Sequence, residues 1–460
     1  MIILQVISWL TIFAMFYFYK RRDIKISIVM VCTMLLSMIY LSPTTTSVRN
    51  MCILCFCLSE LRYLKSDFGI LKRTIVGKTL LIVLISHVIS YFSSPHLFGN
   101  AAGTKDLIVE IVSCDFLIAY SYLSFRKRKD LGLFYKVLFG CLVILTFFAI
   151  VNFLFMRADF VNYAAQNSRI EMGNIGDKYS DGEGRFRVQA MFTNPFDYGY
   201  LCLVCLGLEL YAFLRKIQKK KYSYIAFFCC LFGIFTCGCR TVIVCFFIGL
   251  LCLLLLLFSK NYKKISYAIL GVFVLLLLYN TVPVIQNKID MTFTAFTDKK
   301  GDKVGGSNLN MRQQQINAVF FHIKDNLLLG RGVGYFRNDL GFDGTLASVK
   351  DGRLMAFEGV YMGYLLERGF VGLSLWILYY LILLLKFYKM RMYERYSSGI
   401  GITVIVMYIS FGCMTGQLLS LYPTLLSLGL FMKICYANKK RKKTQLVRIG
   451  ISGSGKKLVK

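Results

Sequence analysis

Apolar residues along this chain are gathered in long blocks instead of alternating with polar ones. Blocks of roughly 17–25 apolar residues have the length that crosses a bilayer as a helix. Because lipid offers the backbone no hydrogen-bond partner, each block is expected to be an α-helix. The weakest blocks are 47–62 and 222–237. The pattern predicts an all-α, polytopic integral membrane protein with about 12–13 transmembrane helices. The predicted spans are 2–19, 24–42, 47–62, 72–93, 105–125, 131–156, 193–214, 222–237, 240–258, 265–283, 357–386, 398–414 and 417–436.

The connections between these blocks are of two alternating kinds. One kind is short and basic, and the other includes long loops of about 36 residues (157–192) and about 73 residues (284–356). Short loops rich in Lys and Arg stay in the cytoplasm. The alternation therefore predicts a multi-pass protein with its N-terminus outside and its C-terminus in the cytoplasm. The basic connections are 20–23, 63–73, 125–130, 215–221, 259–264, 386–395 and 438–443.

The same alternation divides the chain into five regions. All five prolines lie in or beside the predicted outer loops, so the backbone is expected to be irregular on the outer side, where a site is usually built. From residue 444 onwards the tail has the composition of a disordered end. The regions are 1–156 (N-terminal transmembrane helices), 157–283 (central helices with an outer loop and arginine motifs), 284–356 (large outer loop), 357–436 (C-terminal helices) and 437–460 (basic cytoplasmic tail).

Composition adds mainly exclusions. The formal charge of +31 would suggest nucleic acid in a soluble domain, but here the Lys and Arg residues lie mostly in short loops between apolar blocks, so no nucleic-acid partner is expected. Most of the 16 cysteines lie inside apolar blocks, where cysteine behaves as a small hydrophobe. The Cys237-Gly238-Cys239 pair is too close for an ordinary zinc site and the chain has only three histidines. We therefore expect no metal and no cofactor.

Two arginines on the predicted outer side require an explanation. Long loops cross the membrane whatever their charge, which accounts for Arg169 and Arg353. It does not account for Arg187 and Arg240, which lie within a few residues of the predicted hydrocarbon edge. Guanidinium groups present planar, paired donors that match phosphate oxygens. Two or three arginines converging on an outer cavity would suit a diphosphate.

The long outer loop is expected to be folded in part. Its segment 310–336 opens with a helix-forming stretch and continues into a glycine-rich turn, GRGVG. The turn is no nucleotide-binding fingerprint, because no strand precedes it. The stretch predicts an amphipathic helix from apolar residues at three- and four-residue spacing, namely Ile316, Val319, Phe320 and Ile323.

Two glutamates open the next apolar block. Glu358 lies at its outer mouth and Glu367 lies deeper. Glu358 is either a solvated acid at a helix N-terminus or a carboxylate that orients or deprotonates a sugar hydroxyl. Glu367 is either a buried packing or capping contact or a second carboxylate of that kind.

Five stretches in this order resemble the O-antigen polymerase and O-antigen ligase superfamily. They are RFRVQAMFTNPFDYGYL (185–201), TCGCRTVIV (236–244), NLNMRQQQ (308–315), NLLLGRGVGYF (326–336) and FEGVYMGYLLERGFVGL (357–373). The resemblance implies a polytopic glycosyltransferase that uses undecaprenyl-diphosphate-linked glycans at the outer face of the bacterial inner membrane. Where ligases carry His-Asn this chain has Glu358-Gly359, and Cys-Gly-Cys replaces Ser-x-Ser before Arg240. The first departure favours a polymerase over a ligase.

The resemblance also implies roles for individual residues. Arg187 and Arg240 would hold the donor's diphosphate and Glu358 would assist the attacking hydroxyl. The residues expected to contact substrate are Arg185, Asn194, Arg312, Arg331, Tyr335 and Tyr361. The superfamily is metal-independent, and the chain has no Asp-x-Asp pair.

The implied partners are an undecaprenyl-diphosphate-linked oligosaccharide, the lipid bilayer, a flippase and a chain-length regulator. Two other functions stay open. One is an O-antigen ligase-like transferase, and the other is a flippase or transporter, which would place helix breaks and charges at mid-membrane.

Overall fold

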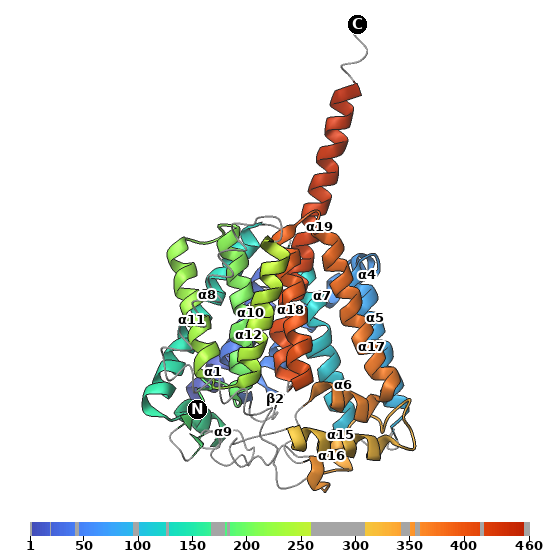
Figure 1. Ribbon diagram of the computed structural model, residues 1–460. Coiled ribbons are helices and arrows are strands. Elements are labelled where there is room, and N and C mark those ends of the chain that lie inside the picture. Colours follow the sequence, from blue (N-terminus) through green and yellow to red (C-terminus); the bar gives the residue numbers. More distant parts are fainter. Residues whose placement is uncertain are drawn as a thin grey trace.

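The computed structural model describes residues 2–18, 20–41, 46–94, 101–125, 128–166, 180–181, 185–258, 309–341, 350–354, 359–414 and 418–454. It is a bundle of helices (Figure 1), so the predicted all-α polytopic membrane fold is confirmed. Seven helices within the described residues are long and apolar enough to cross a membrane. They are Ile75–Phe92, Leu107–Ser124, Asp130–Phe155, Pro195–Leu214, Arg240–Leu257, Val360–Met390 and Arg395–Met414.

Twelve of the thirteen predicted spans coincide with helices, and span 265–283 lies outside the described residues. The seven long helices contain α5 (Ile75–Phe92), α7 (Leu117–Ser124), α8 (Arg128–Phe155), α10 (Pro195–Leu214), α12 (Arg240–Phe258), α17 (Val360–Met390) and α18 (Arg395–Met414). The other five predicted spans are α1 (Ile2–Tyr17), α2 (Arg22–Leu35), α3 (Val48–Glu60), α11 (Lys220–Thr236) and α19 (Leu418–Ser454). The number of membrane crossings stays a prediction.

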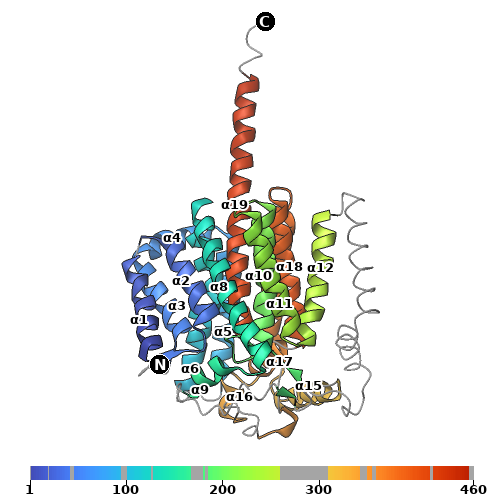
Figure 2. The same cartoon turned by 90° about the vertical axis from the view of Figure 1, so that its left-hand side faces the viewer.

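The described parts of the two kinds of connection lie at opposite ends of the bundle (Figures 1 and 2). One end, which we call the loop end, holds the N-terminus with α6 (Ala101–Val109), α9 (Asp159–Gln166), α15 (Leu309–Ile323) and α16 (Tyr335–Asn338). The opposite end, which we call the tail end, holds α4 (Leu64–Lys72) and the projecting part of α19. This separation agrees with the predicted alternation of the loops. Which end faces the cytoplasm stays a prediction.

The centre of the bundle is formed by α10, α18 and α19, which pack against one another. Side chains of α10 are buried along most of its length, whereas α12 and α17 leave more of their apolar surface for lipid. Small residues allow the helices to approach closely. A Cβ added to Gly429 of α19 would lie 2.3 Å from the backbone oxygen of Ile118 in α7.

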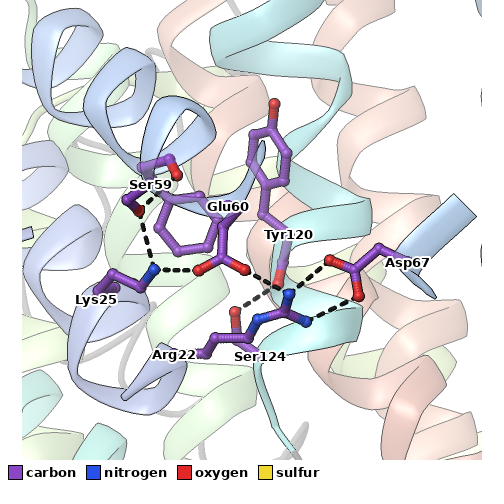
Figure 3. Close-up of polar contacts among 8 residues, drawn as sticks. Arg22, Lys25, Ser59, Glu60, Asp67, Tyr120 and Ser124 are labelled. Carbon is purple, nitrogen blue, oxygen red and sulfur yellow. Dashed lines mark hydrogen bonds and ion pairs between the residues drawn. The ribbon is translucent and has the colours of Figure 1, made fainter. Parts of the chain in front are cut away.

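A group of buried charges fastens helices at the tail end (Figure 3). The Arg22 guanidinium donates to both oxygens of Asp67, at 3.0 and 2.6 Å, and forms an ion pair with Glu60 at 2.5 Å. Lys25, fully buried, pairs with Glu60 and donates to the Ser59 hydroxyl at 2.9 Å. Two cations thereby meet two carboxylates, and α2 is joined to the end of α3 and to α4.

The structure differs from the predicted elements in four places. The predicted span 105–125 contains a π-helical segment, η2 (Glu110–Asp115), between α6 and α7. Helix α17 is broken at Gly369. The basic connection 63–73 is largely helical, since η1 (Leu61–Tyr63) leads into α4. The tail prediction is wrong as far as Ser454, because α19 continues through 444–454 as a helix.

Strands are confined to two small hairpins in the described residues. They pair β1 (Tyr40–Leu41) with β2 (Thr46–Ser47), and β3 (Ser180–Asp181) with β4 (Arg185–Phe186), both antiparallel. The second hairpin fixes the backbone next to one of the two predicted site arginines, because β4 ends directly before Arg187.

Candidate functional site

The structure brings Arg187 to the turn that precedes Arg240. The Val188 backbone N–H donates to the Thr236 carbonyl at 3.2 Å, which joins the segment after β4 to the end of α11. A Cβ added to Gly238 would lie 3.1 Å from Cγ of Arg187, so the aliphatic part of that side chain lies against the turn. Helix α12 begins two residues later at Arg240. Both arginines are half-buried, and both belong to one structural unit at the loop end, which we call the arginine turn (Arg187 with Cys237–Arg240).

The local sequence explains this turn. Gly238 has φ +66, the left-handed region that glycine enters without steric cost. Cys237 and Cys239 are both buried. Their thiols lie 3.2 Å from the Ile234 carbonyl and 3.3 Å from the Cys237 carbonyl, respectively. Both thiols are thus held within the turn by backbone carbonyls.

The start of α10 packs directly on the arginine turn. Asn194 caps the helix, since its Oδ1 accepts the Phe196 N–H at 2.9 Å, and Pro195 occupies the first helical position. This contact explains the Asn-Pro motif by capping, and a substrate contact of Asn194 stays a prediction. A Cβ added to Gly199 would lie 2.6 Å from Sγ of Cys237. Asp197, in the same first turn, is buried and is a carboxylate near the site that the sequence reasoning did not select.

Arg185 lies in β4, opposite Asp181 in the hairpin register. Its backbone therefore leads into Arg187, and its predicted contact with substrate stays a prediction.

The loop 284–356, predicted to lie outside, is folded as far as it is described. Helix α15 packs against α17 and against η4 (Gly352–Leu354). The amphipathic prediction holds for Val319 and Ile323, which are fully buried, whereas Phe320 is 41% exposed. Gln315 shares the buried face and accepts a hydrogen bond from Arg312 Nη1 at 3.1 Å. Arg312 is thereby positioned on the first turns of a helix at the loop end.

Contacts inside the loop hold Arg331 and Tyr335 near each other. The Arg331 guanidinium donates to the His322 backbone carbonyl and to Asp325 Oδ2, the latter at 3.1 Å. The Tyr335 hydroxyl lies 3.2 Å from His322 Nδ1. Burial raises the pKa of Tyr335, so its hydroxyl stays protonated at neutral pH. Through these contacts both side chains stabilise the loop. Their contact with substrate stays a prediction.

Two further predicted residues belong to the start of α17. Glu358 lies outside the described residues, so its predicted catalytic role rests on the sequence. Tyr361 lies in the first turn of α17, against α18. A Cβ added to Gly412 would lie 3.0 Å from Cε2 of Tyr361. Gly359 precedes the helix in an extended conformation.

The segment Leu327–Gly334, which we call the strap, runs along the break in α17. Two strap amides donate to α17, Arg331 N–H to the Leu366 carbonyl and Gly332 N–H to the Glu367 carbonyl, both at 2.9 Å. Two α17 amides donate back, Phe370 N–H to the Leu327 carbonyl and Val371 N–H to the Leu328 carbonyl, both at 3.0 Å. The strap therefore replaces the hydrogen bonds that an unbroken helix would have formed within itself.

The sequence reasoning missed a group of buried ionisable residues near the loop end. Arg368 Nη2 donates to both carboxylate oxygens of Glu110 at 2.8 Å. His87 Nε2 lies 2.5 Å from Asp115 Oδ2, with both side chains almost fully buried. The only signal in the sequence was an ionisable residue inside an apolar block, which usually marks a functional region. The pairing could not be foreseen, because it depends on the π-helical turn of η2.

No cluster of three or more His, Cys, Asp or Glu side chains suited to a metal ion is present in the described part of the chain. Metal independence stays a prediction for the chain as a whole.

Comparison with known families gives one match. Residues 225–377 match the family model Wzy_C, described as O-antigen ligase. The match takes in the arginine turn from Cys237 onwards, α15, the strap and the first half of α17, so it includes four of the five stretches that carried the resemblance. No curated protein matched the chain.

Proposed function

We propose that this chain, whose residues 225–377 match a family model described as O-antigen ligase, is a polysaccharide polymerase. It transfers a growing glycan from undecaprenyl diphosphate to a sugar hydroxyl of a second lipid-linked repeat unit. The family description supports ligase- or glycosyltransferase-type chemistry in general. The polymerase reaction, the prenyl diphosphate donor and the inner-membrane location are the finer parts of the proposal.

The observation that carries the proposal is the arginine turn. In the transfer, the bond between the anomeric carbon and the diphosphate oxygen breaks, and negative charge grows on the leaving diphosphate. Fixed positive groups aimed at that developing charge are the largest single source of stabilisation in such reactions. Arg187 and Arg240 are brought to one turn at the loop end, where they would bind the diphosphate through paired donors.

The remaining steps are assigned to residues around that turn. A new bond forms between the anomeric carbon and the acceptor oxygen, and the hydroxyl proton passes to a base, for which Glu358 is proposed. The prenyl chain would lie in the bilayer against apolar helices. Arg312, on α15, and the strap would cover the sugar side of the site. The positive charge of the two guanidinium groups takes the place of a metal ion in this proposal.

Two observations bear on the alternatives. Glu358-Gly359 stands where ligases carry His-Asn, which favours a polymerase. The break in α17 and the buried Arg368–Glu110 pair are features found in transporters and favour a flippase. In this chain, however, the strap fills the break and Glu110 pairs with Arg368, so both features have structural partners, which argues against a flippase.

The test is the surface polysaccharide of a strain that lacks the gene. A polymerase deletion leaves single repeat units on a ladder gel, a ligase deletion leaves full polymer without attachment, and a flippase deletion accumulates the lipid-linked unit in the cytoplasm. The last two patterns would contradict the proposal. Chemical labelling of cysteines introduced at each terminus tests the proposed orientation, N-terminus outside and C-terminus inside. A flippase and a chain-length regulator are its proposed partners in the cell.

A further inference from the structure

Helix α17 consists of two helical segments that are separated by a kink. Gly369 has φ 60 and ψ −166, which is not helical, and it separates Val360–Arg368 from the helix that follows. We call the nine residues Val360–Arg368 the entry half-helix. Because the backbone at Gly369 does not continue the helix, the direction of the entry half-helix depends on side contacts. Tyr361, a predicted substrate contact, lies in its first turn.

The strap and the break fit each other only because both carry glycine. A Cβ added to Gly369 would lie 2.4 Å from the Leu328 carbonyl oxygen, and one added to Gly330 would lie 2.5 Å from the Gly369 nitrogen. Both glycines also have positive φ, +60 and +71, which other residues rarely adopt. The backbones of the strap and of α17 are therefore in direct contact at this level.

Glu367 holds the strap from the entry half-helix. Its carboxylate oxygen Oε1 accepts the Gly334 N–H at 3.1 Å, and its backbone carbonyl accepts the Gly332 N–H at 2.9 Å. The Ser90 hydroxyl of α5 donates to the same backbone carbonyl at 3.1 Å. One residue thus joins the glycine-rich turn, α5 and α17. The carboxylate has a structural partner, and that partner is an N–H group that needs an acceptor.

Arg368 holds a second side of the entry half-helix. Its guanidinium, 2% exposed, donates to Glu110 of η2 and lies 4.4 Å from the centre of the Tyr364 ring. Neighbouring residues of one short helix are therefore fastened in two directions, Glu367 to the strap and Arg368 to η2. A short helix that is held in two directions at its C-terminal end has little freedom at its N-terminal end.

We propose that Glu367 and Arg368 are positioning residues for the transfer reaction. They set the direction of the entry half-helix and so the location of Tyr361, a predicted substrate contact in its first turn. We call the contacts of Glu367 with the strap and of Arg368 with Glu110 the clamp. The clamp rests on these observed contacts, whereas the identity of the reaction rests on the proposed function above. A one-ångström displacement of a reacting group lowers rates by about a hundredfold, so a loosened clamp acts mainly on turnover.

The chemistry of the Gly334 N–H separates this role from a catalytic one. Glutamine has the shape of glutamate and retains an oxygen that accepts a hydrogen bond. Methionine has a similar volume but no acceptor of comparable strength. Leaving a half-buried N–H without its acceptor shifts the local opening equilibrium by about 5-fold or more. The clamp therefore tolerates Glu367→Gln and fails in Glu367→Met.

The experiment measures hydrogen exchange and activity on the same purified full-length protein in lipid nanodiscs. For Glu367→Met, we expect the peptide that contains 327–336 to exchange about tenfold faster or more than in the unaltered protein. For Glu367→Gln, we expect less than about a threefold change. Glu209→Met is the matched control. Glu209 is a fully buried glutamate of α10 near the tail end, whose carboxylate accepts from Gln218, and its loss should leave the strap unchanged.

Activity on a lipid-linked repeat unit completes the test. We expect Glu367→Met to lower kcat by about tenfold or more with little change in KM, and Glu367→Gln to stay within about threefold. Unaltered strap exchange in Glu367→Met would overturn the clamp. So would equal loss of kcat in both variants with normal strap exchange, because the carboxylate would then act in the chemistry. If the unaltered protein makes no polymer but the exchange pattern holds, the clamp stands and the proposed function has failed.

Discussion

Two buried groups of charges lie toward opposite ends of the bundle, and they are paired to different extents. At the tail end, Arg22 uses both terminal nitrogens on Asp67 and Glu60, and only its Nε has no partner among the described residues (Figure 3). Toward the loop end, Arg368 uses Nη2 alone. Its Nε and Nη1, and Nδ1 of His87, have no hydrogen-bond partner within the described part of the chain.

The difference indicates what each group is for. At the tail end, two cations are matched by two carboxylates, and their ion pairs join helices. Buried donors without acceptors are costly, and such costs are usually retained where function requires them. We therefore expect changes at the tail end to act on stability and changes near the loop end to act on activity per folded molecule.

The largest expected effect comes from the arginine turn. Arg240→Lys keeps the charge but loses the paired donors, and we expect polymer formation to fall by about 10²–10³-fold, the usual loss when one such donor is removed. Arg215→Lys is the matched control at the tail end, where Arg215 pairs with Glu394, and it should leave polymer formation within about threefold. Ladder gels at equal protein levels give the measurement. Long-chain polymer in the Arg240→Lys strain would remove the basis for the site.

The second effect comes from the break in α17. Gly369→Ala places a Cβ against the Leu328 carbonyl in a backbone conformation that alanine avoids, at a cost of about 1–2 kcal/mol or more. We expect turnover to fall by about tenfold or more. Gly140→Ala in α8, where a Cβ meets nothing within 4 Å, should be neutral or slightly stabilising. Equal behaviour of the two variants in thermal unfolding and in turnover would show that the break has no special role.

The third effect tests the two charge groups against each other. Glu110→Gln removes the charge opposite Arg368, and Asp67→Asn removes one of the two carboxylates opposite Arg22. Both should lower the unfolding temperature, because each leaves a buried cation less well compensated. Only Glu110→Gln should lower turnover per folded molecule, by about fivefold to tenfold. Loss of turnover in Asp67→Asn alone would reverse the comparison.

The smallest effect concerns pH at the surface of the loop 284–356. Hydrogen bonds from Arg353 and from His322 lower the pKa of Asp351 below its usual range. A depressed carboxylate pKa stabilises the fold above the unfolded-state pKa of about 3.9 and loses that contribution as pH falls through the folded value. Hydrogen exchange of α15 and η4, corrected for intrinsic rates, should therefore stay constant from about pH 7 to about pH 5. Asp351→Asn should raise it at all these pH values, and a loosening already at pH 5 in the unaltered protein would contradict the assignment.

The fold was predictable from the sequence because the length and hydropathy of each segment determine whether it forms a helix. Twelve apolar blocks became helices, since length and hydropathy alone require it in lipid. The arginine turn was predictable in part, because Arg187 and Arg240 both stand at the ends of apolar blocks. Asn194 was selected because it also stands at the start of an apolar block. Its hydrogen bond from the Phe196 N–H explains the residue by helix capping.

The clamp was not predictable, because it depends on backbone irregularities inside apolar blocks. Hydropathy treats Glu110 and Asp115 as two acids in one span and cannot show the π-helical turn that carries them. Nor does it show that Gly369 breaks a helix, since glycine occurs inside many transmembrane helices. The sequence leaves Glu367 open between a packing or capping contact and a functional acid, and in the structure its carboxylate accepts the Gly334 N–H.

A cryo-EM structure of the protein in a lipid nanodisc with undecaprenyl diphosphate would show directly whether the arginine turn binds the donor. We predict diphosphate density at the loop end, within about 2.7–3.2 Å of donor nitrogens of both Arg187 and Arg240. A diphosphate bound elsewhere, or two guanidinium groups that face separate cavities, would contradict it.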